Sequence, residues 1–264
     1  MSNIKTGNIK TYYELTGKGE TVVFIHGLGS SAEDWSYQTE FFSKHFQVLA
    51  YDVRGHGQSD KPKGAYSVPL FAEDLLNLLN ALAIEKVHIV GLSMGGWIVF
   101  QFGLDYPERV KSLTVVNSWA DMRLKKISDK INFYKRTVLF QLLTMRKIGE
   151  IIGKKLFIKP EQKELLQNFI EKWAKNHKPS YLASFKAVKG WSVEDRLSEI
   201  TCPVLVVSAD EDYTPVSDKE AYAAKMINAE FVELAVVKDS RHATPVEHPA
   251  EFNQVVGKFL SKVK

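Results

Sequence analysis

A serine in a glycine-rich turn is the first residue of this chain that could do chemistry. Residues 91–95, GLSMG, have the pattern G-x-S-x-G, follow an apolar run at 86–92 and open a helix-like stretch. A serine in this strand–turn–helix context sits on a tight turn that lifts its hydroxyl above the sheet, at the N-terminus of a helix. We therefore expect Ser93 to be a nucleophile, with the N–H of Met94 free to stabilise an oxyanion. The alternative is a glycine-rich turn with an incidental serine.

One histidine lies where a base for this serine is needed. A serine hydroxyl is a poor nucleophile at neutral pH unless a base lies beside it. His242 is in a loop at 239–245 that follows the apolar run 231–237. Other histidines fit less well: His45 and His177 lie in charged stretches expected to be helical, and His88 lies within a predicted strand. We predict that His242 is the base; the alternative is an exposed loop histidine.

Three acids follow the apolar run 203–209, and one of them could orient the base. A carboxylate beside the imidazole fixes its tautomer and stabilises the imidazolium. Of Asp210, Glu211 and Asp212, we select Asp212 as the acid, and Asp210 remains the alternative. The chain order is then serine, aspartate, histidine, which is the order expected after a nucleophile elbow of this kind.

A second glycine-rich loop, HGLGS at 26–30, follows the apolar run 21–25. Such a loop can turn a backbone N–H toward the serine, and Leu28 is our choice for the second oxyanion donor. His26 is expected to hold this loop through side-chain hydrogen bonds. The alternative is an ordinary turn.

The elements that position these residues alternate between strands and helices. Consecutive apolar, β-branched residues indicate strands covered on both faces of a parallel sheet, and helical spacing recurs at 71–79, 220–226 and 250–260. This alternation predicts a doubly wound α/β fold, in which ligands bind beyond the carboxyl ends of the strands. The predicted strands are 21–25, 47–53, 86–92, 112–117, 203–209 and 231–237.

The alternation breaks between residues 119 and 190, where apolar residues recur at helical spacing only. We predict a core of 1–118 and 191–264 with a helical insertion at 119–190. Most aromatic residues of the insertion should pack in its own core, and about two should reach a pocket. They are Trp119, Phe133, Tyr134, Phe140, Phe157, Phe169 and Trp173.

Composition narrows the class of protein. The chain has 264 residues, 45% hydrophobic and 25% charged, which is ordinary for a globular domain. It has one cysteine, which excludes an intrachain disulfide, and no apolar run approaches the ~20 residues of a membrane span. The N-terminus has no secretory pattern, so we expect a cytoplasmic protein. No cofactor, metal or nucleic-acid partner is predicted, and oligomeric state is not addressed by these patterns.

Charge is unevenly distributed along the chain. Residues 121–190 hold 17 Lys and Arg against 6 Asp and Glu, a net charge of +11, whereas the whole chain carries +4 and the rest therefore −7. The plain interpretation is solvated lysines on helical faces. Two others are steering of anionic substrates, such as carboxylated lactones, and association with anionic membrane surfaces.

With these motifs the chain resembles the α/β-hydrolase fold superfamily over essentially its full length. Residues 52–59, DVRGHGQS, resemble its D-x-R-G-x-G-x-S loop, and 247–249 resemble its E-x-P helix start. Residues 209–212 resemble its G-x-x-D, with Ala209 in place of glycine and one residue fewer before Pro215. These departures keep Asp210 open as the acid.

The resemblance implies a helical cap after the sixth core strand and a cofactor-free serine hydrolase. Its implied substrate is a small ester, lactone or related carbonyl compound, as for a carboxylic-ester hydrolase, cleaved through an acyl-enzyme. Serine at position 93 argues against a haloalkane dehalogenase. The alternatives are haloperoxidase or lyase activity on the same triad, or a ligand-binding receptor.

Overall fold

A computed structural model describes residues 2–263 as an eight-stranded sheet flanked by helices. The strand order is β1-β2-β4-β3-β5-β6-β7-β8. β2 pairs antiparallel with both β1 and β4, and all other pairs are parallel. The predicted doubly wound, mostly parallel sheet is confirmed. Strand bounds are β1 Ser2–Thr6, β2 Ile9–Thr16, β3 Thr21–Ile25, β4 Gln47–Tyr51, β5 Val87–Leu92, β6 Val110–Val116, β7 Val204–Ala209 and β8 Val232–Val237.

The sequence prediction missed β1 and β2, because these strands are only partly buried and lack a continuous apolar run. The six predicted strands all exist: the strand at 21–25 has the predicted bounds, and the other five differ by one or two residues at one or both ends. The predicted strand at 47–53 ends at Tyr51, since Asp52 already turns away to bind two backbone N–H groups.

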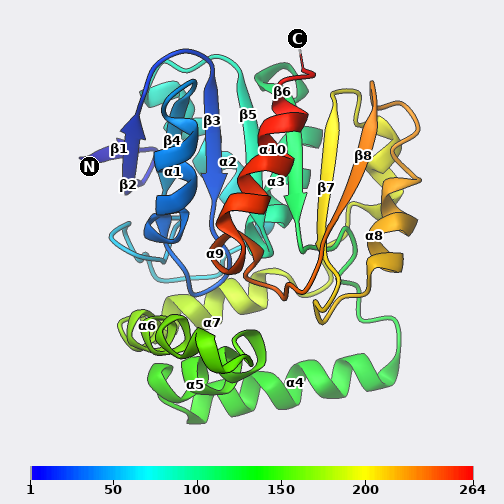
Figure 1. Ribbon diagram of the computed structural model, residues 1–264. Helices are drawn as coiled ribbons and strands as arrows, with labels where there is room; N and C mark the ends of the chain where they lie inside the picture. The colour runs from blue at the N-terminus through cyan, green and yellow to red at the C-terminus, as the bar shows by residue number, and fades with distance from the viewer. Residues whose placement is uncertain (1, 264) are drawn as a thin grey trace.

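Helices cover both faces of the sheet (Figure 1). On one face α2, α3 and α8 enclose a core that includes Phe71, Phe100 and Tyr222. On the other face α1 and α10 enclose a second core around Trp35 and Phe252. The helix bounds are α1 Ser36–Phe42, α2 Val68–Ala81, α3 Met94–Asp105, α8 Val216–Ala223, α9 Thr244–Glu247 and α10 Pro249–Leu260, with short 3-10 helices at Ala32–Trp35, Pro107–Arg109 and Glu194–Glu199.

Four further helices form a separate layer between β6 and β7 in the chain, which we call the α4–α7 layer. Figure 1 shows it across the end of the sheet toward which β3 and β6 run. It has its own apolar core, including Phe140, Ile148 and Trp173. The bounds are α4 Ile127–Leu142, α5 Met145–Leu156, α6 Lys163–Ala174 and α7 Lys178–Ala187, with a 3-10 helix at Pro160–Gln162.

The chain enters and leaves this layer at adjacent points. Asp121 and Ser192 form an antiparallel β-bridge. Arg123 links the same two segments, because its guanidinium lies 2.9 Å from an Asp121 oxygen and 2.7 Å from a Glu194 oxygen. The layer is therefore joined to the sheet through one compact base.

Two histidines are not in the helices expected from the sequence. His45 lies in a turn between α1 and β4, and His177 is the N-cap of α7. Their charged neighbours suggested solvated helix faces, but the helices end or begin beside them. Within residues 2–263, no helix is long and apolar enough to cross a membrane, and no cluster of three or more His, Cys, Asp or Glu could hold a metal ion.

Candidate active site

Ser93 stands on a strained turn between β5 and α3. Its backbone has φ 55° and ψ −111°, in the left-handed half of φ space that L residues rarely adopt. The turn is closed by glycines: a Cβ on Gly91 would lie 2.3 Å from the Gly95 carbonyl oxygen, and one on Gly95 would lie 2.2 Å from the Ile25 carbonyl oxygen. Only glycine allows this approach, which holds the serine above the sheet at the start of α3.

The loop after β3 lies against this serine. The register pairs Ile25 with Gly91, so both loops leave the sheet at the same edge. A Cβ on Gly27 would lie 3.6 Å from the Ser93 Cβ. Neither the N–H of Leu28 nor that of Met94 donates to an acceptor within residues 2–263. Two unpaired backbone donors therefore flank the serine, as an oxyanion site requires.

Buried polar groups fix the position of that loop. The Val53 N–H donates to Nε2 of His26 at 3.0 Å, and His26 Nδ1 lies 2.8 Å from the Gly27 carbonyl oxygen. Burial lowers the pKa of His26 to about 4, so the ring is neutral and Nε2 can accept. The Asp52 carboxylate accepts from the N–H of Ala32 at 2.8 Å. His26 thus holds the loop structurally, as the sequence suggested.

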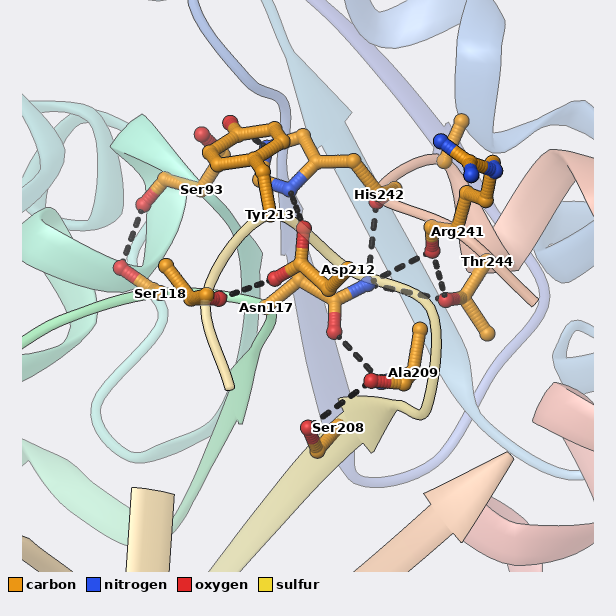
Figure 2. A network of polar contacts seen from close by, with 12 residues as sticks. Ser93, Asn117, Ser118, Ser208, Ala209, Asp212, Tyr213, Arg241, His242 and Thr244 are labelled. Carbon is orange, nitrogen blue, oxygen red and sulfur yellow. Dashed lines mark hydrogen bonds and ion pairs between the residues drawn. The ribbon is translucent and has the colours of Figure 1, made fainter. Parts of the chain in front are cut away.

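His242 and Asp212 form a hydrogen-bonded pair beside the serine (Figure 2). Nδ1 of His242 lies 2.8 Å from Oδ1 of Asp212. The imidazole is 8% exposed and the Asp212 side chain is fully buried. The alternative acid, Asp210, points elsewhere: its carboxylate accepts from the Ser240 N–H at 3.3 Å and lies 3.9 Å from the Lys238 ammonium.

A buried lysine lies on the other oxygen of Asp212. Nζ of Lys219, from α8, is 3.0 Å from Oδ2, and both side chains are 0% exposed. The Thr214 hydroxyl also donates to Oδ2. Burial would raise the pKa of the Asp212 carboxyl, but its bond to His242, the Thr214 hydroxyl and the Lys219 charge together lower it. Burial in turn lowers the pKa of Lys219. Asp212 therefore stays ionised between two nitrogen donors.

Asn117 clamps the two loops that carry this pair. It follows β6 with a φ of 44°, and its Nδ2 donates to the His242 carbonyl oxygen at 3.0 Å. The same amide donates to the Thr244 hydroxyl at 2.9 Å, and its Oδ1 accepts from the Ala209 N–H at 2.8 Å. One side chain therefore fixes the end of β7, before Asp212, to the loop of His242 (Figure 2).

The Tyr213 hydroxyl is hydrogen-bonded to Nε2 of His242, the nitrogen to which a nucleophilic serine would bind. This hydroxyl lies 2.6 Å from Nε2 of His242, and the two rings pack with centroids 4.2 Å apart. No hydrogen bond within residues 2–263 joins the Ser93 hydroxyl to His242. Nδ1 of His242 donates to the Asp212 carboxylate, so Nε2 of the neutral imidazole is an acceptor. The phenol therefore donates to the imidazole in this state.

A cavity of about 1900 Å³ lies between the sheet edge and the α4–α7 layer, and Ser93, Leu28 and His242 line it. The expectation that about two aromatic side chains of the insertion reach this pocket was wrong. Tyr181 and Phe185 of the insertion also line it. Of the seven aromatic residues considered from the sequence, six border it and Tyr134 does not, because residues of the layer's own core, such as Phe140 and Trp173, also form the cavity wall. The six are Trp119, Phe133, Phe140, Phe157, Phe169 and Trp173.

Sequence reasoning missed three residues of this site. Tyr213 is adjacent to Asp212, but nothing in the sequence shows that its ring turns back onto the imidazole. Lys219 lies in α8, the helix that follows Asp212. From sequence alone, a lysine in such a helix is expected on its solvent-exposed face. Asn117 was included in a predicted strand, although a polar residue at a strand end is a signal that could have identified it.

Comparison with known proteins agrees with this architecture. The model of the alpha/beta hydrolase fold family matches residues 20–249. The chain is 30% identical over 254 residues to "Putative carbamate hydrolase RutD" of Caulobacter segnis, covering 91% of each chain. It is 29% identical to (E)-2-((N-methylformamido)methylene)succinate hydrolase of Acinetobacter baylyi, covering 98% of this chain and 96% of the relative.

A solved structure agrees as well. A hydrolase from Pseudomonas aeruginosa PA01 superposes with a TM-score of 0.88 at 26% identity, over 98% of this chain and 97% of the other. The family match spans most of the chain, and the relatives are matched nearly end to end. The chain belongs to the α/β-hydrolase fold family and is a hydrolase of that family.

Proposed function

We propose that this protein is a serine hydrolase that cleaves an ester, lactone or related carbonyl bond of a small molecule. The observation that carries the proposal is the meeting of three groups in one cavity. Ser93 is raised on a strained turn, His242 is hydrogen-bonded to buried Asp212, and two N–H donors flank the serine without acceptors of their own. Residues 119–190 are proposed as the cap that roofs the cavity.

The proposed reaction has two steps. Nε2 of His242 takes the proton of Ser93 as its oxygen bonds to the carbonyl carbon, and the N–H groups of Leu28 and Met94 bind the oxyanion. The imidazolium, held by Asp212, protonates the leaving group as its bond to carbon breaks. Water then attacks the acyl-enzyme, His242 takes its proton, and the acid is released as Ser93 regains a proton. Each step uses only groups of the protein and water.

The first step requires Tyr213 to release the imidazole. Its hydroxyl and the serine hydroxyl compete for one lone pair on Nε2. Tyr213 lines the cavity and is 61% exposed, so its ring can turn aside without disturbing the packed core. A substrate entering the cavity would displace the phenol and leave Nε2 to Ser93.

A fluorophosphonate probe tests the proposal without knowledge of the substrate. We expect stoichiometric labelling of wild-type protein at Ser93 and none of Ser93→Ala, which should remain folded by circular dichroism. A ligand-binding receptor with an inactive serine would not be labelled. Turnover of esters by Ser93→Ala at more than a trace level would refute the role of this residue.

The bond type is then resolved by a substrate screen. Methyl and p-nitrophenyl esters of increasing chain length, lactones and carbamates cover the carbonyl compounds that these steps can open. Carbamates are included because a relative is described as a carbamate hydrolase. A haloperoxidase or lyase alternative predicts weak hydrolysis of all three classes despite efficient labelling.

A further inference from the structure

Arg136, from α4, lines the cavity beside two phenylalanine rings. Its guanidinium carbon lies 5.1 Å from the ring centroid of Phe140 and 5.1 Å from that of Phe185. All three side chains line the cavity that also holds Ser93. The two rings lie edge to face with their centroids 5.3 Å apart, so both contact the guanidinium from one side. A contact with an aromatic ring uses no hydrogen bond, so the N–H groups of the guanidinium remain available to a ligand.

No acidic side chain within residues 2–263 forms an ion pair with the Arg136 guanidinium. Within residues 2–263, Arg136 has no carboxylate within 4.0 Å and no hydrogen bond. The acids that line the cavity are otherwise engaged. Asp34 pairs with Lys172 at 2.8 Å, Glu171 pairs with Arg146 at 2.7 Å, and Glu211 lies 3.3 Å from Arg241.

An unpaired guanidinium beside an aromatic wall can bind an anion. Arg136 is itself an exposed residue, but the two rings on one side of it hydrate the charge poorly, which strengthens its attraction to an anion. Arginine also presents two parallel N–H donors that match a carboxylate.

Arg136 shares its cavity with the catalytic pair. Tyr213, His242 and Ser93 line the same cavity as Arg136. The Tyr213 hydroxyl lies 2.6 Å from Nε2 of His242. A ligand held at Arg136 is therefore in one cavity with the nitrogen and the serine that would react with it.

We infer that Arg136 binds a carboxylate of the substrate, so that the preferred substrate is an anionic carbonyl compound with its carboxylate in the α4–α7 layer and its scissile bond at Ser93. This inference rests on the proposed hydrolase function and names its substrate class. It also assigns part of the positive charge of residues 121–190 to direct contact with the substrate rather than to long-range steering.

The test compares matched esters of dicarboxylic acids. Monomethyl succinate, glutarate and adipate each carry one carboxylate, and their dimethyl esters are neutral compounds of the same chain. Hydrolysis is followed by pH-stat titration for wild type, Arg136→Met and Lys135→Met. Lys135 is the matched control, because it is an exposed cation on the same helix that does not line the cavity.

Wild type should prefer the monomethyl ester of at least one chain length. Arg136→Met should lower kcat/KM for that monoester by about 10- to 100-fold, the usual effect of removing a charge-assisted hydrogen bond. Its effect on the dimethyl ester should be under about threefold, and Lys135→Met should leave both nearly unchanged. An equal loss on both esters, or an equal loss from Lys135→Met, would overturn the inference.

A binding measurement keeps the inference separate from the proposed chemistry. Isothermal titration calorimetry with succinate, glutarate and adipate needs no turnover. We expect wild type and Lys135→Met to bind one of these dianions with similar affinity and Arg136→Met to bind it at least tenfold more weakly. Equal binding by all three proteins, or no binding by wild type, refutes the carboxylate site. Binding lost with Arg136 while no ester is cleaved refutes the proposed hydrolysis alone.

Discussion

Replacing Lys219 by methionine would remove a positive charge from beneath the histidine–aspartate pair. Nζ of Lys219 lies 3.0 Å from one oxygen of Asp212, and Nδ1 of His242 lies 2.8 Å from the other. The lysine therefore repels the protonated form of the imidazole while it neutralises part of the carboxylate that stabilises that form. Without it, the imidazolium should be more stable and the base should retain its proton to higher pH.

The contacts give the size of this effect. The two contacts in series place the ammonium about 7 Å from the imidazole, and two unit charges at that distance interact by about 2 kcal/mol at an effective dielectric constant of 20. Since about 1.4 kcal/mol corresponds to one pH unit, the acid limb of kcat/KM should move up by about 1 to 2 pH units. Above that limb the rate should approach the wild-type value.

The assay is the pH profile of kcat/KM on a neutral ester from pH 5 to 10. Lys225→Met is the control, because the exposed Lys225 pairs with Glu194 and not with Asp212. Urea unfolding at each end of the range shows whether the variant is folded, since breaking a buried ion pair can cost about 3–5 kcal/mol. A folded Lys219→Met with an unmoved or lowered acid limb would refute the reasoning.

Three other changes test the site and its frame. Tyr213→Phe should speed fluorophosphonate labelling by about fivefold, because a hydrogen bond worth about 1 kcal/mol no longer occupies the base; slower labelling would mean that the phenol assists the reaction. Asp212→Asn should lower kcat by about 10³–10⁴-fold, whereas Asp210→Asn should change it by less than about fivefold; the reverse order would make Asp210 the acid. Gly95→Ala should lower the free energy of unfolding by about 2–4 kcal/mol, measured in urea, because its Cβ would meet the Ile25 carbonyl oxygen at 2.2 Å; a loss under about 1 kcal/mol would contradict the tight turn.

The sheet and the position of the candidate site were predictable because both follow from local patterns. Buried parallel strands have continuous apolar runs, and residues just after such runs must meet at one edge. This is why Ser93 and His242 could be assigned to one site from segments about 150 residues apart, as the numbering shows.

Features that depend on tertiary packing were not predictable. Lys219 is buried because α8 packs against β7 and β8 with that side turned toward Asp212, and nothing near it in the sequence indicates the rotation of the helix. The aromatic residues of the α4–α7 layer have the same spacing whether they face a core or a cavity. In β1 and β2 the alternation of buried and exposed residues is weak, so their sequence pattern differs little from that of a loop.

The joined entry and exit of the α4–α7 layer have a consequence for how this protein could change over evolution. The β-bridge between Asp121 and Ser192 makes the layer an insertion whose two ends meet, so it can be lengthened, shortened or exchanged without moving any strand. Arg136 and most of the aromatic wall belong to that insertion, whereas Ser93, Asp212 and His242 belong to the sheet. With the roles proposed above, the groups that select the substrate and the groups that break the bond lie in separate segments of the chain. A graft of residues 122–191 onto a related sheet is then expected to transfer the preference for anionic substrates without the catalytic residues.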